Sequence, residues 1–159
     1  MLAGVLRTYA PRGQTPVLRV PLTRDHLSVI SGITRSGQLL TGMQERAYKG
    51  ADAVCFLKHL QRQLDDKLLV IWDGLPAHQE RAVKQFLTEA GGGICVEQLP
   101  GYAPDLNPDE GVWNYLKHDE LGNVAGHNLG ELRYLLRLAI ARLRAKPDII
   151  CSFFKHYGY

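Results

Sequence analysis

The architecture of this chain is indicated most clearly by Leu68-Leu-Val-Ile-Trp-Asp-Gly74. Five apolar residues in a row are typical of a strand that is buried on both faces of a sheet, as parallel strands are. The acid and the glycine that follow place a carboxylate where the chain turns out of the sheet. Because parallel sheets hold their ligands at the carboxyl ends of their strands, Asp73 is the first candidate functional residue.

On either side of this run, the pattern of apolar residues changes between strand and helix. Residues 26–33 and 38–44 flank an Arg-Ser-Gly turn and predict a hairpin. Helical spacing predicts helices over residues 51–64, 78–90, 109–118 and 129–145, and a further strand is predicted over residues 94–99. A hairpin followed by strand–helix units predicts an α/β fold, with a mixed sheet flanked by helices.

Length and composition fit one domain over residues 1–159, with 45% hydrophobic residues and a net charge of +3. This charge is compatible with a nucleic-acid partner but does not indicate one. The three cysteines form no Cys-x-x-Cys pair, which argues against a zinc ribbon and favours a reducing compartment. Neither a signal peptide nor a run near the roughly 20 residues of a membrane helix is found, so a cytoplasmic protein without a membrane partner is expected.

A second candidate acid lies in Asn107-Pro-Asp-Glu110. Asn107 suits the cap of a helix and Pro108 its first position, so a capping box alone would account for Glu110. Asp109 is interpreted as a first-turn charge that the helix dipole favours. Asp73 also has a structural alternative, since Asp-Gly is a common turn pair.

Asp73 and Glu110 together indicate more than either acid alone. Carboxylates from separate elements that converge at a strand end are the ligands that Mg²⁺ and Mn²⁺ prefer. Two such ions about 4 Å apart can activate the attacking oxygen and stabilise the leaving oxygen of a phosphodiester. In an unrelated α/β domain with chance acids, the two carboxylates would lie too far apart for one such site.

Four segments of the chain carry recognisable motifs: Leu69-Val-Ile-Trp-Asp-Gly-Leu-Pro-Ala-His78, Leu99-Pro-Gly-Tyr-Ala-Pro-Asp-Leu-Asn-Pro-Asp-Glu110, Val112-Trp-Asn-Tyr-Leu-Lys117 and Arg7-Thr-Tyr-Ala-Pro-Arg-Gly-Gln-Thr-Pro16. They resemble the catalytic half of DDE transposases, and most closely the bacterial insertion-sequence group related to mariner elements. The spacing between the two acids is also close to that of the group. The combination is specific, although each motif alone is weak.

The resemblance implies an RNase H-like mixed sheet flanked by helices and a three-acid, two-metal site for DNA cleavage and strand transfer in transposition. Asp73 matches the second acid and Glu110 the third, which implies Mg²⁺ or Mn²⁺ as cofactor and transposon ends and target DNA as partners. His78 matches a histidine common in the family motif, which makes it a candidate neighbour of the site. The alternative for His78 is a polar residue at a helix start.

The chain departs from the family pattern in its first residues. The family's first acid lies on the first, central strand, before the segment that Arg7 begins here, but residues 1–6 contain no acid. Asp25 is a poor substitute, because it starts the second strand. The family's helix-turn-helix region would also precede Arg7. The expectation is a catalytic-domain fragment whose first strand is largely missing and which has little or no strand-transfer activity alone.

Loss of a central strand would leave two unpaired inner edges, for which residues 2–6 or another chain are the candidate partners. The alternative function is a non-catalytic relic that binds DNA or full-length transposase and modulates assembly; self-association is the other partner considered. Candidate DNA-contacting side chains are Arg7, Arg12, Arg133, Arg137 and Arg144. A solvated surface is the alternative for these arginines.

Overall fold

The computed structural model describes residues 11–13, 27–64, 67–101, 103–122 and 128–156. Its strands are β1 (Ser28–Ile33), β2 (Leu39–Gln44), β3 (Leu68–Trp72) and β4 (Ile94–Gln98). Its α-helices are α1 (Gly50–Gln63), α2 (Arg81–Glu89), α3 (Asp109–Tyr115), α4 (Leu129–Arg144) and α5 (Pro147–His156). Short helical turns are η1 (Pro76–Gln79), η2 (Pro104–Leu106) and η3 (Leu116–Glu120). The sequence-based interpretations of Arg7, Asp25 and residues 1–6 lie outside the described residues.

The predicted hairpin is confirmed. Strands β1 and β2 pair antiparallel, from Ser28 opposite Gln44 to Ile33 opposite Leu39. The turn between them requires a left-handed residue, and Gly37 supplies it with φ of +84°. The Gly37 amide donates to the Thr34 carbonyl at 3.0 Å, which closes the turn.

The apolar run of β3 pairs parallel with β4, from Leu68 opposite Ile94 to Trp72 opposite Gln98. The predicted helix over residues 78–90 is wrong at its start. The chain first forms the 3₁₀ turn η1, and the extended backbone of Glu80 separates this turn from α2. The reason is local, because the His78 side chain bonds back to Asp73 and so keeps η1 wound around the end of β3.

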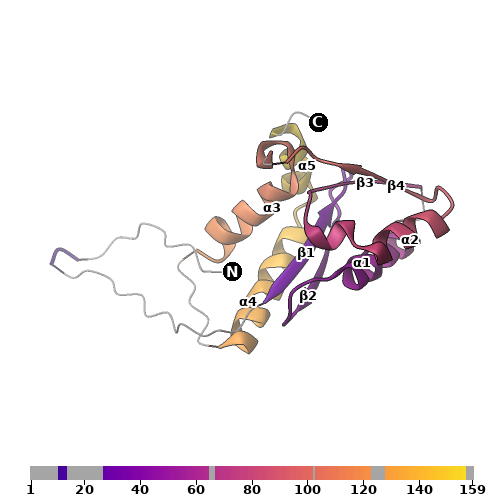
Figure 1. Ribbon diagram of the computed structural model, residues 1–159. Coiled ribbons are helices and arrows are strands. Elements are labelled where there is room, and N and C mark those ends of the chain that lie inside the picture. The colour runs from indigo at the N-terminus through magenta and orange to yellow at the C-terminus, as the bar shows by residue number, and fades with distance from the viewer. Residues whose placement is uncertain (1–10, 14–26, 65–66, 102, 123–127, 157–159) are drawn as a thin grey trace.

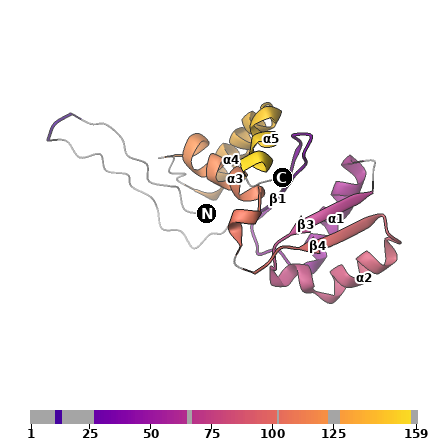
Figure 2. The same ribbon diagram turned by 90° about the horizontal axis from the view of Figure 1, so that it is seen from above.

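Two apolar clusters hold the elements together. In the first cluster, α3, α4 and α5 pack against the hairpin, with Leu136, Leu143 and Ile150 at most 1% exposed. The second cluster joins α1, α2, β3 and β4 around Leu57 and Val83. Figures 1 and 2 both show the β1–β2 hairpin between these two groups of helices.

The C-terminal third differs from the prediction in two places. The helix predicted over residues 109–118 ends as α3 at Tyr115 and continues as the π-type turn η3. Helix α5 is not predicted, although Pro147 occupies the first helical position, where proline is favoured. Of the helices in the described residues, none has the length and apolarity that crossing a membrane requires.

The four strands form two separate two-stranded sheets. Over the described ranges, no strand joins β1 to β3. A cavity of about 940 Å³ lies between these strands instead, and all residues of β1 and of β3 line it. Asp73 and Asp109 border the same cavity, so the open space between the sheets leads to the candidate site.

Candidate functional site

Asp73 follows the last residue of β3, at the carboxyl end of the strand. Its Oδ1 accepts a hydrogen bond from the Leu75 amide at 3.3 Å and lies 3.1 Å from Nδ1 of His78. These contacts fix the carboxylate through one oxygen only. The side chain is 49% exposed, so the carboxylate is held in place and is accessible from solvent.

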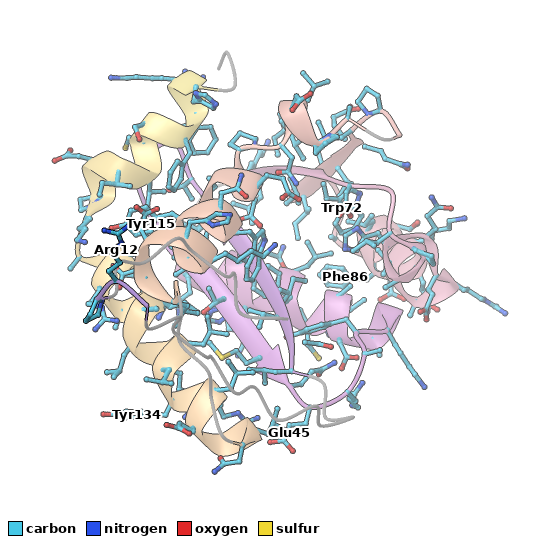
Figure 3. All side chains as sticks on the ribbon, turned by 90° about the vertical axis from the view of Figure 1, so that its left-hand side faces the viewer. Arg12, Glu45, Trp72, Phe86, Tyr115 and Tyr134 are labelled. Carbon is cyan, nitrogen blue, oxygen red and sulfur yellow. The ribbon has the colours of Figure 1, made fainter. Side chains whose placement is uncertain are left out.

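His78 reaches Asp73 from η1 and is largely buried there. Its Nδ1 lies 3.1 Å from the Asp73 carbonyl oxygen as well as 3.1 Å from the carboxylate. Because both partners are acceptors, Nδ1 carries the proton and donates to them. The imidazole stacks on Trp72 with a centroid separation of 4.3 Å and an interplanar angle of 8°. Trp72, which is labelled in Figure 3, thus fixes the imidazole ring that contacts Asp73.

Asp109 opens α3 and connects this helix to the hairpin. Its Oδ2 accepts hydrogen bonds from Oγ of Ser31 at 2.6 Å and from Nε1 of Trp113 at 3.0 Å. Its Oδ1 is enclosed and has no hydrogen-bond partner among the residues that the structure describes. Burial raises the pKa of Asp109 to about 6, and repulsion from the carboxylates of Glu110 and Asp73 adds to the increase.

Glu110 is the second residue of α3 rather than the third, because the helix begins at Asp109. The Asn107 side chain accepts a hydrogen bond from the Asp109 amide at 3.1 Å. Over the part of the chain that the structure describes, the Glu110 carboxylate accepts no hydrogen bond from the Asn107 backbone amide, as a capping box would require. The capping-box explanation for Glu110 therefore loses its support.

Asp73 and Asp109 reach the same cavity from two different sheets. Asp73 lies at the end of β3, while Asp109 attaches the start of α3, and with it Glu110, to Ser31 on β1. Asp73 and Asp109 both line the cavity between the sheets, and Glu110 follows Asp109 in α3. Carboxylates that border one cavity attract cations and repel the phosphates of a nucleic acid unless a cation is present.

The described acids of this region provide only part of the ligand set that a divalent metal ion needs. Carboxylate oxygens are the right ligand type for Mg²⁺ or Mn²⁺. Among the described residues, however, no three acids, histidines or cysteines lie close enough together to hold an ion. Asp73 and Glu110 would be two ligands of a site that needs a further donor.

The candidate DNA-contacting arginines fall into two groups. Arg133 pairs with Glu45 at 3.1 Å, at the lower end of the view in Figure 3, and Arg144 donates from Nε to the Leu39 carbonyl at 2.8 Å. Both side chains thus connect α4 to β2 or its end. Arg12 and Arg137 are exposed.

Sequence reasoning missed Asp109. Its interpretation as a first-turn charge is incomplete, because the side chain is half-buried and hydrogen-bonded to Ser31 and Trp113. A signal was present in the sequence. Trp113 lies one helical turn after Asp109, and an indole N–H on a buried helix face needs an acceptor.

Three solved structures of Mos1 mariner transposase resemble the chain. The strand transfer complex is 17% identical with a TM-score of 0.59, and the paired-end complex with Mn is 18% identical with a TM-score of 0.61. They cover 99% and 100% of this chain but 51% and 53% of their own chains, so the chain spans about half their length. The catalytic domain alone is 17% identical with a TM-score of 0.52, covering 82% of this chain and 74% of its own.

This likeness confirms the predicted RNase H-like α/β fold. No curated protein sequence matches the chain. The family comparison is decisive, since the sequence matches the family described as DDE superfamily endonuclease over residues 4–133. The chain therefore belongs to the DDE superfamily endonuclease family.

Proposed function

We propose that this chain is a transposase catalytic domain of the mariner-related bacterial group, built for metal-dependent DNA cleavage and strand transfer. Family membership supports an endonuclease, and the Mos1 structures are complexes of a transposase with the same fold. The observation that carries the proposal is that Asp73, at the end of β3, and Asp109, the neighbour of Glu110 and bonded to Ser31 of β1, line the same cavity. In this proposal Asp73 and Glu110 are the second and third acids, and His78 orients Asp73.

The proposed cofactor is Mg²⁺ or Mn²⁺, which would supply charge neutralisation at the scissile phosphate. Asp73 presents one carboxylate oxygen that is free of the contacts made by Leu75 and His78. Among the described residues, the Glu110 carboxylate makes no hydrogen bond to the Asn107 backbone amide, so capping does not occupy it. Since the described residues provide no third ligand, we propose that the first acid comes from outside them.

Metal binding and DNA cleavage provide the test. Mn²⁺ affinity would be measured by electron paramagnetic resonance, and cleavage with a labelled duplex that carries transposon-end DNA. We expect Asp73→Asn and Glu110→Gln each to weaken Mn²⁺ binding at least about tenfold, because each removes one charged ligand. Asp105→Asn is the matched control, since Asp105 is an exposed acid on the preceding turn. Equal Mn²⁺ affinity in all four proteins would contradict the proposed site.

A second candidate function is a non-catalytic partner that binds DNA or full-length transposase. Among the described residues, no strand pairs with the inner edges of β1 and β3, and this favours the second function because open edges are sites for pairing with another chain. The two functions are separated by the cleavage assay, together with duplex affinity measured across salt concentrations. Metal-independent DNA binding that weakens steeply with salt, without any cleavage, would favour the second function.

A further inference from the structure

A second, smaller cavity of about 320 Å³ is lined from the end of α1, the start of β2 and the end of α4. Figure 1 shows the hairpin between these two helices. The apolar part of the lining consists of Leu39, Leu40 and Leu64, and the polar part of Gln38, His59, Gln63 and Arg144. None of the candidate acids lines this cavity, so it does not belong to the candidate metal site.

The Arg144 guanidinium is held in one orientation by two hydrogen bonds to β2. Its Nε donates to the Leu39 carbonyl at 2.8 Å, and its Nη2 donates to Oγ1 of Thr41 at 2.9 Å. These bonds occupy one edge of the planar group. Over the described ranges, Nη1 makes no hydrogen bond, so the edge formed by Nη1 and the second Nη2 hydrogen keeps its donors. Arg144 is thus fixed through one edge and can bind a ligand through the other.

Arg144 also differs from two other arginines of α4 in its lack of a counter-ion. Arg133 pairs with Glu45 at 3.1 Å, and Arg142 pairs with Glu120 at 2.7 Å. Among the residues that the structure describes, no carboxylate pairs with Arg144, and none of the residues that line the cavity is an acid. A cavity with an unpaired cation and no acid has a positive potential, which favours an anion.

The other polar side chains of the cavity have hydrogen-bond donors to offer. The His59 imidazole has a ring contact with Phe56, at a centroid separation of 6.3 Å. Within the described part of the chain, its nitrogens and the side-chain amides of Gln38 and Gln63 form no hydrogen bonds. An imidazole and two amides each provide at least one N–H.

The arrangement of these donors indicates the kind of anion. Donors from α1, from the residue before β2 and from α4 surround the cavity, which suits a tetrahedral phosphate better than a planar carboxylate. An arginine edge binds phosphate through two parallel hydrogen bonds. We propose that this cavity binds a phosphate group, with Nη1 and Nη2 of Arg144 as the bidentate contact and His59 and Gln63 as further donors. This inference does not depend on the proposed nuclease activity.

The test is an NMR titration of the full chain with sodium phosphate, without divalent ions and with sodium chloride at the same ionic strength as reference. The Nε–Hε signal of Arg144 should shift to saturation with phosphate and stay in place with chloride. Gln63→Glu should weaken phosphate binding at least about tenfold, because it places a negative charge in the cavity. The backbone amide spectrum of each variant shows whether its fold is retained.

Gln61→Glu is the matched control, since it makes the same charge change on the same helix. Residues two positions apart face different sides of a helix, and Gln61 does not line the cavity. We expect it to change phosphate affinity by less than about twofold, because solvent and salt screen a charge outside the cavity.

A duplex oligonucleotide distinguishes the two sources of a phosphate group. If the ligand is a nucleic-acid backbone, the duplex shifts the same Arg144 signal, inorganic phosphate competes with it, and Gln63→Glu weakens duplex binding more than Gln61→Glu does. A response to inorganic phosphate alone assigns the cavity to free phosphate or a small phosphate ester. The absence of a saturable shift with either ligand would overturn the proposal, as would equal weakening by Gln63→Glu and Gln61→Glu.

Discussion

Replacement of Asp109 by asparagine should increase the free energy of unfolding at neutral pH. In mild acid this increase should disappear. Both donors to Asp109, Ser31 and Trp113, bind the same oxygen, Oδ2. An asparagine amide oxygen at that position keeps both hydrogen bonds. The amide nitrogen takes the place of Oδ1, which already has no partner. The substitution thus removes the charge with little change in contacts.

The magnitude follows from the pKa of Asp109, which rises from 3.8 to about 6 on folding. Between these values the folded state binds the proton more tightly than the unfolded state, so stability falls as pH rises through this window. At pH 7.5 the charged Asp109 carboxylate therefore lowers the free energy of unfolding by about 3 kcal/mol. Neutral hydrogen bonds are weaker than charged ones by about 1 kcal/mol, so the net gain of Asp109→Asn is about 1–2 kcal/mol.

Urea unfolding at pH 4.5, 6.0 and 7.5, with EDTA present to remove divalent ions, measures this effect. The difference in free energy of unfolding between Asp109→Asn and the wild type should fall by about 2 kcal/mol from pH 7.5 to 4.5. Asp105→Asn makes the same chemical change at an exposed acid and controls for effects of net charge. A difference for Asp109→Asn that stays constant to within about 0.5 kcal/mol would refute the reasoning.

Three further substitutions, with Arg137→Leu as a control for the third, test the packing that positions the site, each by urea unfolding. Leu136→Ala should lower the free energy of unfolding by about 2–5 kcal/mol. Leu136 is 1% exposed, so its truncation leaves a cavity between α4 and the hairpin. Gly37→Ala should cost about 2–3 kcal/mol, since φ is +84° and the added Cβ would meet Pro147 at 2.8 Å. Arg144→Leu should lower the free energy of unfolding by about 1 kcal/mol, because the Leu39 carbonyl loses its hydrogen bond from Arg144. Arg137→Leu, at an exposed position of the same helix, should change the free energy of unfolding by less than about 0.5 kcal/mol. A larger loss for Arg137 than for Arg144 would contradict the assignment of Arg144 to the contact between α4 and β2.

The strands and helices whose apolar residues recur at a regular spacing could be predicted from the sequence. The apolar run of β3 and the alternating hairpin strands each have a pattern that one secondary structure satisfies best, and the strands occur where they are predicted. The prediction that β3 is buried on both faces is wrong for the described residues, because Leu69 and Ile71, which share one face of the strand, are 63% and 47% exposed. The core face of α4 was predictable for the same reason, since Leu136, Ala139 and Leu143 recur at helical spacing and are all buried. The position of Asp73 at a strand end followed directly from the strand.

Features set by side-chain contacts across the fold were not predictable in the same way. The start of α2 is displaced because His78 bonds to Asp73 and stacks on Trp72, and periodicity does not encode such a contact. The role of Asp109 depends on Ser31, which lies 78 positions earlier in the chain. A hydrogen bond between such distant residues is fixed by tertiary structure, and no local pattern reports it.

The two candidate acids are held by different sheets, and this makes the space between the sheets part of the site. Asp73 is fixed to β3 by His78 and the Trp72 ring. Glu110 is fixed to β1 through the bond between its neighbour Asp109 and Ser31. Any strand that joins β1 to β3 therefore also sets the separation of the Asp73 and Glu110 carboxylates. Because metal ligands must be placed to within a fraction of an ångström, strand pairing at the inner edges would control the metal binding that we propose for the two acids.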